Sequence, residues 1–185
     1  MSPLRPVAKL NALTAEDARM ALREVCGSSR WVRTVESARP FHDAEALHHA
    51  AEEAWDALAR TDWFEAFAAH PRIGEDRRVS GGEASDWSRA EQAAVSAAGQ
   101  ERDELEKVQH AYERLFGWPY IVCATGRTAA ELLADCRDRM ANEPEDEIGA
   151  AAGEERRIGR LRLVKLLADL EFSDDDAFTP AEGTQ

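Results

Sequence analysis

The sequence has few cysteines, no long apolar run and a shortage of positive charge. Its three cysteines, Cys26, Cys123 and Cys136, are widely spaced and form no C-x-x-C pair, so they predict neither a disulfide framework nor a zinc knuckle. No uncharged apolar stretch approaches the ~18 residues that a membrane-spanning helix needs. A formal net charge of −13 argues against binding to nucleic acid or to anionic membranes. We therefore expect a cytoplasmic protein with reduced thiols.

Motifs for cofactors and metals are absent as well. The chain has no glycine-rich phosphate loop, no G-x-S-x-G and no H-E-x-x-H. His48 and His49 are adjacent on a predicted helix and point in different directions, so with His42 they indicate surface positions and not a metal cluster. His110 stands among charged residues, where solvent exposure is the default. We expect no cofactor and no metal.

Apolar residues recur with helical spacing along most of the 185 residues. One stretch, Tyr120 to Ala124, resembles a strand, but it has no partner run, so we interpret it as a buried extended segment or as part of a helix. The predicted fold is an all-α, single-domain bundle of about seven to nine helices. We expect an irregular N-terminal arm at 1–13, an all-α catalytic domain at 14–172 and a disordered acidic tail at 173–185. The longer helices are predicted at about 15–25, 44–59, 101–116, 128–141 and 145–171.

Several short polar residues are placed to cap these helices. Thr14 and Asp43 are predicted N-caps, and Thr61-Asp62 is expected to cap the short helix that precedes His70. Ser88 and Glu91 form the S-x-x-E pattern of a capping box. This pattern gives Glu91 a purely structural interpretation beside any catalytic one.

The stretch from His70 to Glu75, HPRIGE, stands out because it ends an apolar helical run. Pro71 cannot donate a backbone N–H, so the helix should stop at about His70. The next helix is predicted to begin near Ser88, which leaves a loop of roughly fifteen residues, longer than most in compact domains. The imidazole thus lies at a helix exit beside buried residues. On sequence physics alone, a hydrogen-bonded core histidine is at least as good an interpretation as a catalytic one.

Arg162 is the second unusual residue. Helical geometry places Ile158 and Leu166 one turn to either side of it, so its guanidinium falls within an apolar stripe. Such an arginine can pair with a core carboxylate, or it can bind a carboxylate or ureido group of a ligand in a bidentate manner. Both interpretations remain open at this point.

These motifs, taken in order, resemble the 2-oxo-4-hydroxy-4-carboxy-5-ureidoimidazoline (OHCU) decarboxylase family of uric acid degradation. The resemblance covers roughly residues 10 to 170. The order in which the motifs occur together is more specific than any single motif. Two departures concern pocket shape: Trp118-Pro119-Tyr120 stands where the family commonly has Phe-Pro-Phe, and Gln109 stands where Asn is usual. The motifs are His70-Pro71, Ser88 to Gln92, Phe116 to Tyr120, Gly126-Arg127 and Leu161 to Leu163, with Cys26-Gly27-Ser28, Trp31 and Arg39-Pro40-Phe41 before them.

The resemblance implies a carboxy-lyase that converts OHCU to S-allantoin and CO2 by a cofactor-free acid–base mechanism. It also implies a small-molecule substrate and a homodimer. His70 and Glu91 would then be catalytic. The implied substrate-binding residues are Pro71, Ser88, Gln92, Tyr120, Ile121, Val122 and Arg162.

Two alternatives from other classes stay open on the sequence. In a non-catalytic helical interaction module, Ser88 and Glu91 would only cap a helix, and Arg162 would only pair with a buried carboxylate. A metal-dependent helical hydrolase would use His70, His110 and carboxylates, although the chain lacks paired i, i+4 ligands.

Overall fold

The computed structural model describes residues 5–73 and 99–172, and these form eight helices. The prediction of an all-α domain is confirmed. The helices are α1 (Arg5–Ala12), α2 (Ala15–Val25), α3 (Ser29–Ser37), α4 (Ala44–Asp56), α5 (Arg60–Ala68), α7 (Gly99–Phe116), α8 (Ala129–Arg139) and α9 (Pro144–Phe172). In this part of the chain, no helix is both long enough and apolar enough to cross a membrane.

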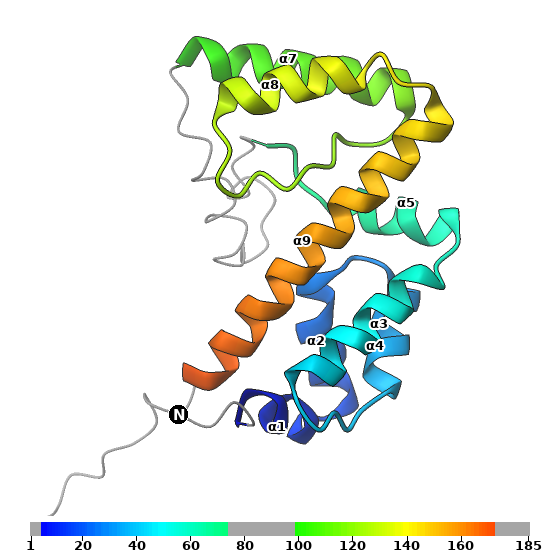
Figure 1. The fold of residues 1–185 in the computed structure, drawn as a ribbon, viewed down its shortest axis with the longest axis vertical. Coiled ribbons are helices and arrows are strands. Elements are labelled where there is room, and N and C mark those ends of the chain that lie inside the picture. The colour runs from blue at the N-terminus through cyan, green and yellow to red at the C-terminus, as the bar shows by residue number, and fades with distance from the viewer. Residues whose placement is uncertain (1–4, 74–98, 173–185) are drawn as a thin grey trace, which may run out of the picture.

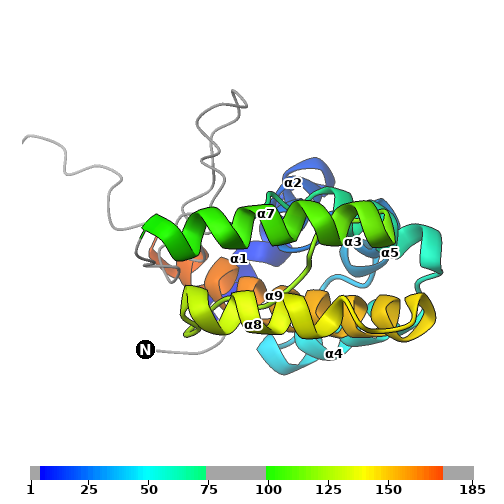
Figure 2. The same cartoon turned by 90° about the horizontal axis from the view of Figure 1, so that it is seen from above.

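Helix α9 runs through the whole molecule, and the other helices are arranged around it (Figure 1). Helices α1, α2, α4 and α5 contact α9 directly, whereas α7 and α8 pair with each other. The α7–α8 pair lies across the end where α9 begins, and a view from above shows the two helices side by side (Figure 2). The extended segment between α7 and α8 therefore passes close to the middle of α9.

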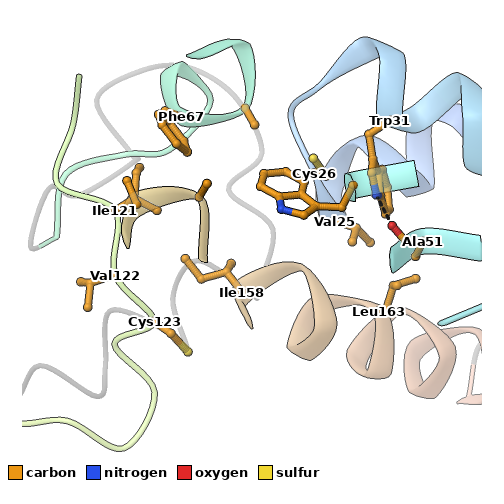
Figure 3. Close-up of a cluster of buried hydrophobic side chains, with 14 of the residues drawn as sticks. Val25, Cys26, Trp31, Ala51, Phe67, Ile121, Val122, Cys123, Ile158 and Leu163 are labelled. Atoms are coloured by element: carbon orange, nitrogen blue, oxygen red, sulfur yellow. Dashed lines mark hydrogen bonds between the residues drawn. The ribbon is translucent and has the colours of Figure 1, made fainter. Parts of the chain in front are cut away.

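Apolar side chains pack against α9 from more than one side (Figure 3). Phe67 of α5 and Ile121 of the extended segment are 0% and 1% exposed, and they belong to the same buried cluster as Ile158 of α9. Trp31 of α3 is buried near Leu163, and its indole Nε1 donates a hydrogen bond of 2.9 Å to the carbonyl oxygen of Ala51. A tryptophan that buries its ring and satisfies its N–H fixes α3 against α4.

The expectation of an irregular arm at 1–13 is wrong for Arg5–Ala12, which form α1. Eight residues are too few for a stable isolated helix, so this helix depends on tertiary packing. Val7 and Leu10 are buried, and Lys9 donates a 2.6 Å hydrogen bond to the carbonyl oxygen of Leu170 near the end of α9. The apolar pattern of α1 is too short to identify a helix without this partner. The predicted tail at 173–185 lies outside the described residues.

Two of the cap predictions are confirmed and one is wrong, while the predicted capping box of Ser88 and Glu91 lies outside the described residues. Thr14 and Asp43 are the N-caps of α2 and α4, and each side chain accepts a backbone N–H three residues later. The short helix α5 has Ala59 as its N-cap, and Asp62 acts from the third helical position by accepting the Ala59 N–H at 2.9 Å. The assignment of Thr61-Asp62 as the cap itself is therefore wrong by two to three residues.

Gly27 lies where the connection between α2 and α3 touches the end of α5. A Cβ at Gly27 would come within 2.3 Å of the Cβ of Ala69. We expect Gly27→Ala to lower the free energy of unfolding by about 1–3 kcal/mol, because the close approach forces the two backbones apart. Gly153→Ala is the matched control, since a Cβ added at Gly153 would meet no described atom within 4 Å and alanine favours the helix. Urea-unfolding midpoints measure both changes, and equal midpoints would contradict the close packing.

Candidate active site

A cleft of about 520 Å³, including the solvent at its mouth, lies between the end of α5, the extended segment and α9. Three parts of the chain that are distant in sequence form its walls. They contribute His70, Pro71, Arg72 and Ile73 from the turn after α5, residues 120–125 from the extended segment, and Ile158 and Arg162 from α9.

The turn that carries His70 is held by its own backbone. α5 ends at Ala68, and the N–H of His70 donates a 3.0 Å hydrogen bond to the carbonyl oxygen of Phe67. Pro71 then prevents the helix from continuing. The imidazole is 10% exposed, and its Nε2 lies 2.6 Å from Oε2 of Glu155, which projects from α9. His70 is therefore anchored between α5 and α9 at the edge of the cleft.

Helix α7 anchors the next residues of the same turn. The buried amide of Gln109 accepts the N–H of Ile73 at 2.9 Å and donates to the carbonyl oxygen of Ile73 at 3.0 Å. One turn further along α7, Glu113 pairs with Arg72 at 2.7 Å. The glutamine that departs from the family pattern thus has a clear structural role, which is to hold the main chain beside the cleft.

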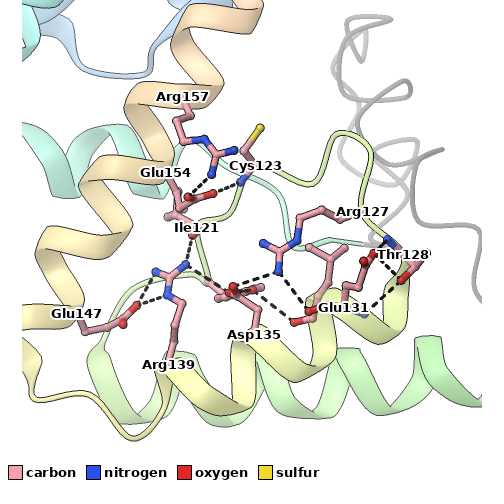
Figure 4. Close-up of polar contacts among 12 residues, drawn as sticks. Ile121, Cys123, Arg127, Thr128, Glu131, Asp135, Arg139, Glu147, Glu154 and Arg157 are labelled. Carbon is pink, nitrogen blue, oxygen red and sulfur yellow. Dashed lines mark hydrogen bonds and ion pairs between the residues drawn. The ribbon is translucent and has the colours of Figure 1, made fainter.

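The extended segment at 120–124 is buried and has neither helical nor strand pairing, as one of the two interpretations predicted. Its backbone groups bond to side chains instead (Figure 4). Arg139 of α8 donates to the carbonyl oxygen of Ile121 at 2.7 Å, and Glu154 of α9 accepts the N–H of Cys123 at 2.8 Å. Buried backbone groups need such partners, so these side chains fix the cleft wall.

Arg139 belongs to a buried polar cluster behind that wall. Its Nε donates to Glu147 at 2.9 Å, and Glu147, which is 0% exposed, also accepts from Asn142 at 2.7 Å and from the hydroxyl of Tyr112. Burial, followed by the hydrogen bond to Glu147, raises the pKa of Tyr112 above its ordinary value. Tyr112 therefore remains a hydroxyl donor.

The Gly126-Arg127 motif closes the turn at the other end of the segment. Gly126 has a φ of +78°, which a side chain would disfavour. Arg127 pairs with Asp135 of α8 at 3.0 Å, and the hydroxyl of Tyr120 also donates to Asp135. The Gly126-Arg127 motif therefore has a structural role, which is to form and hold this turn.

Two of the three cysteines, Cys26 and Cys136, do not offer a nucleophile. All three are buried and free. Burial raises the pKa of Cys26, and it raises the pKa of Cys136 to about 12, so both stay protonated near neutral pH. Among the described residues, no group of three or more His, Cys, Asp or Glu side chains is placed to hold a metal ion.

The cleft brings together six of the nine residues that the sequence singled out: His70, Pro71, Tyr120, Ile121, Val122 and Arg162. The other three, Ser88, Glu91 and Gln92, lie outside the described residues. Sequence reasoning missed Glu155 and Arg139. A signal for Glu155 was available, because it lies three residues before Ile158 and seven before Arg162 and so belongs to the same helical stripe.

Comparison with known proteins gives consistent matches. The family model described as OHCU decarboxylase matches residues 11–164. A solved structure of OHCU decarboxylase in the presence of (S)-allantoin is 31% identical, with a TM-score of 0.69, over 80% of this chain and 96% of that one. The mouse 2-oxo-4-hydroxy-4-carboxy-5-ureidoimidazoline decarboxylase is 29% identical over 71% of this chain and 75% of its own length.

A longer relative is also similar. The uric acid degradation bifunctional protein of Arabidopsis thaliana is 36% identical over 78% of this chain. The match spans only 45% of that protein, and only 32% of the bifunctional protein of Bacillus subtilis. The chain thus spans less than half the length of these bifunctional relatives.

Proposed function

Because this chain belongs to the OHCU decarboxylase family, we propose that it removes CO2 from OHCU to form S-allantoin in uric acid degradation. The observation that carries the proposal is the cleft in which His70 and Arg162 meet the backbone of the extended segment. An imidazole, a guanidinium and peptide groups can together bind a small, anionic and hydrogen-bonding substrate.

The proposed chemistry needs no electron sink from a cofactor. When the carboxylate leaves as CO2, the electron pair of the broken C–C bond forms a C=C bond to the adjacent ring carbon and displaces the C=N pair onto the ring nitrogen. That nitrogen takes up a proton, which gives an enol. The carbon that bears the ureido group then takes up a proton, and the hydroxyl loses its own to become the ring carbonyl. The protein therefore needs to position the substrate, polarise it and deliver one proton to one face.

Each residue of the site has its own role in this reaction. His70 contacts the hydroxyl and carboxylate at the reacting carbon and transfers the proton, and Arg162 binds an anionic or carbonyl oxygen. Glu91, Ser88 and Gln92 hold the ring and ureido N–H groups. Pro71 and the backbone of Tyr120, Ile121 and Val122 line the remaining surface.

Circular dichroism of allantoin provides the decisive assay. Incubation with freshly generated OHCU should produce the S-allantoin band faster than the spontaneous reaction, and exhaustive treatment with EDTA should leave that rate unchanged. A rate equal to the spontaneous one would reject the function. Activity lost with EDTA and restored by a divalent ion would reject the metal-free mechanism.

Glu91→Gln separates capping from catalysis. Glutamine also serves at the third position of a capping box, so a structural Glu91 should tolerate the change at a cost below ~1 kcal/mol of stability. As a catalytic group, Glu91 needs its carboxylate, and we expect a folded protein with almost no turnover. Initial rates and a thermal melt on one preparation measure both properties. Normal turnover by the Gln variant would reject a catalytic role for Glu91 and leave only the capping role.

We also propose a cytoplasmic homodimer that acts without a cofactor and without nucleic-acid or membrane partners. Three buried free thiols and the strongly acidic composition support this setting. Sedimentation equilibrium should give twice the chain mass of 20.5 kDa. A monomer at the concentration of the assay would reject the dimer and leave the decarboxylase proposal in place.

A further inference from the structure

Glu155 is a buried carboxylate that the proposed reaction does not yet use. It projects from α9 towards the turn after α5, and its Oε2 lies 2.6 Å from Nε2 of His70. The side chain of Glu155 is 1% exposed. The two groups make an ion-pair contact and not an aligned hydrogen bond, and among the described residues neither oxygen of Glu155 has a hydrogen-bond partner.

A buried carboxylate without a donor is costly, so Glu155 requires hydrogen or positive charge on the atom it faces. That atom is Nε2 of His70. The ring nitrogen Nε2 is itself buried from solvent, whereas the residue lines the cleft. We infer that Nδ1 is the nitrogen that a substrate in the cleft can reach. The contact therefore distinguishes the two ring nitrogens, one turned to α9 and the other available to a substrate.

Cys26 is another titratable group near Glu155. The thiol of Cys26 has its pKa raised by burial first and then by the negative charge of Glu155, while Arg162 acts in the opposite direction. Cys26 and Glu155 also line one cavity beside α9. A thiol is only a weak donor, so His70 is the stronger of these two neighbours of Glu155.

We propose that Glu155 is a positioning residue that keeps the hydrogen of His70 on Nε2, so that Nδ1 is the atom that exchanges a proton with the substrate. This inference rests on the proposed function for its catalytic meaning. A carboxylate that orients a histidine fixes its tautomer and the direction of its free nitrogen, and the loss of such a group costs turnover without removing a substrate contact.

The test combines nuclear magnetic resonance with kinetics. Long-range proton–nitrogen spectra of the histidine rings, with His70 assigned by its Asn variant, should show hydrogen on Nε2 in the wild type at the pH of the assay. Glu155→Gln keeps the shape but offers an amide that can either donate or accept, so the tautomer should become mixed. We expect kcat to fall at least ~10-fold with KM little changed.

Glu52→Gln is the matched control. Glu52 pairs with Arg156 and Arg160 and lines a separate cavity of about 300 Å³ that Glu155 also borders. Removing its charge should leave the His70 tautomer and kcat unchanged. This control separates the loss of the His70 partner from a general change of charge beside α9.

Two outcomes would overturn the inference: a wild-type His70 with its lone pair on Nε2, or a Glu155→Gln enzyme with the wild-type kcat. If Glu155→Gln does not fold, the tautomer of His70 in the wild-type protein is the deciding observation. A hydrogen on Nε2 would support the inference, and a lone pair on Nε2 would contradict it. A wild-type protein that does not act on OHCU would reject the proposed function. The spectra would still report on the pair of His70 and Glu155.

Discussion

His70→Asn should lower kcat/KM at least ~10²-fold while the protein keeps its helical signal and its cooperative melt. Asparagine retains a polar side chain of similar volume but cannot take up or release a proton near neutral pH. The imidazole contacts Glu155, but the backbone bond to Phe67 and the side chains of Gln109 and Glu113 also hold the turn. We therefore expect the cleft to persist without its proton-transfer group.

His49→Asn is the control for this substitution. His49 is 71% exposed on α4 and pairs with Glu53, which is equally exposed, so its replacement should change neither rate nor melt. If His70 had only a structural role, stability would fall by roughly 1–3 kcal/mol while the folded fraction turned over normally. A destabilised but fully active His70→Asn protein would remove this residue from the mechanism. Stereospecific rates and melts from one preparation decide between the two results.

Arg139→Met should lower the free energy of unfolding by about 3–5 kcal/mol, the usual cost of breaking one side of a buried ion pair. The substitution leaves Glu147 buried without its cation and deprives the carbonyl oxygen of Ile121 of its donor. The lost ion pair and the lost hydrogen bond both involve the groups that hold the cleft wall in place. Urea unfolding measures the change, and kcat/KM under native conditions reports whether the wall has moved.

Two further variants test this interpretation. The double substitution Arg139→Met with Glu147→Leu should recover much of the stability, because no unpaired charge remains. Arg60→Met breaks an ion pair with Glu145 in which both side chains are more than half exposed, and it should cost less than ~1 kcal/mol. Equal losses for Arg139→Met and Arg60→Met would contradict the importance of burial.

The parts of the fold that sequence reasoning predicted well depend on local rules. α9 is expected at about 145–171 and observed at Pro144–Phe172, because its apolar stripe and its opening proline act over neighbouring residues. Caps such as Thr14 and Asp43 are recognisable for the same reason. The placement of His70 at a helix exit follows from Pro71 alone.

The parts that were missed depend on contacts between distant residues. Gln109 holds the backbone of Ile73 across 36 positions, and no spacing rule connects the two. Arg139 reaches the carbonyl oxygen of Ile121 in a segment without regular structure, where side-chain periodicity gives no information. Glu155 does share a stripe with Arg162, but a carboxylate in a charged run cannot be assigned a partner until the turn after α5 is placed.

The continuity of α9 limits how the gene for such a protein can vary. Glu155 and Arg162 stand seven residues apart on one unbroken helix, about 10 Å along its axis at ~1.5 Å per residue. Inserting or deleting a single residue between them would rotate the later position by about 100° and turn its side chain out of the cleft. We therefore expect this interval to tolerate substitutions but no change of length, whereas the connections between the other helices can lengthen or shorten without altering the spacing of these two groups.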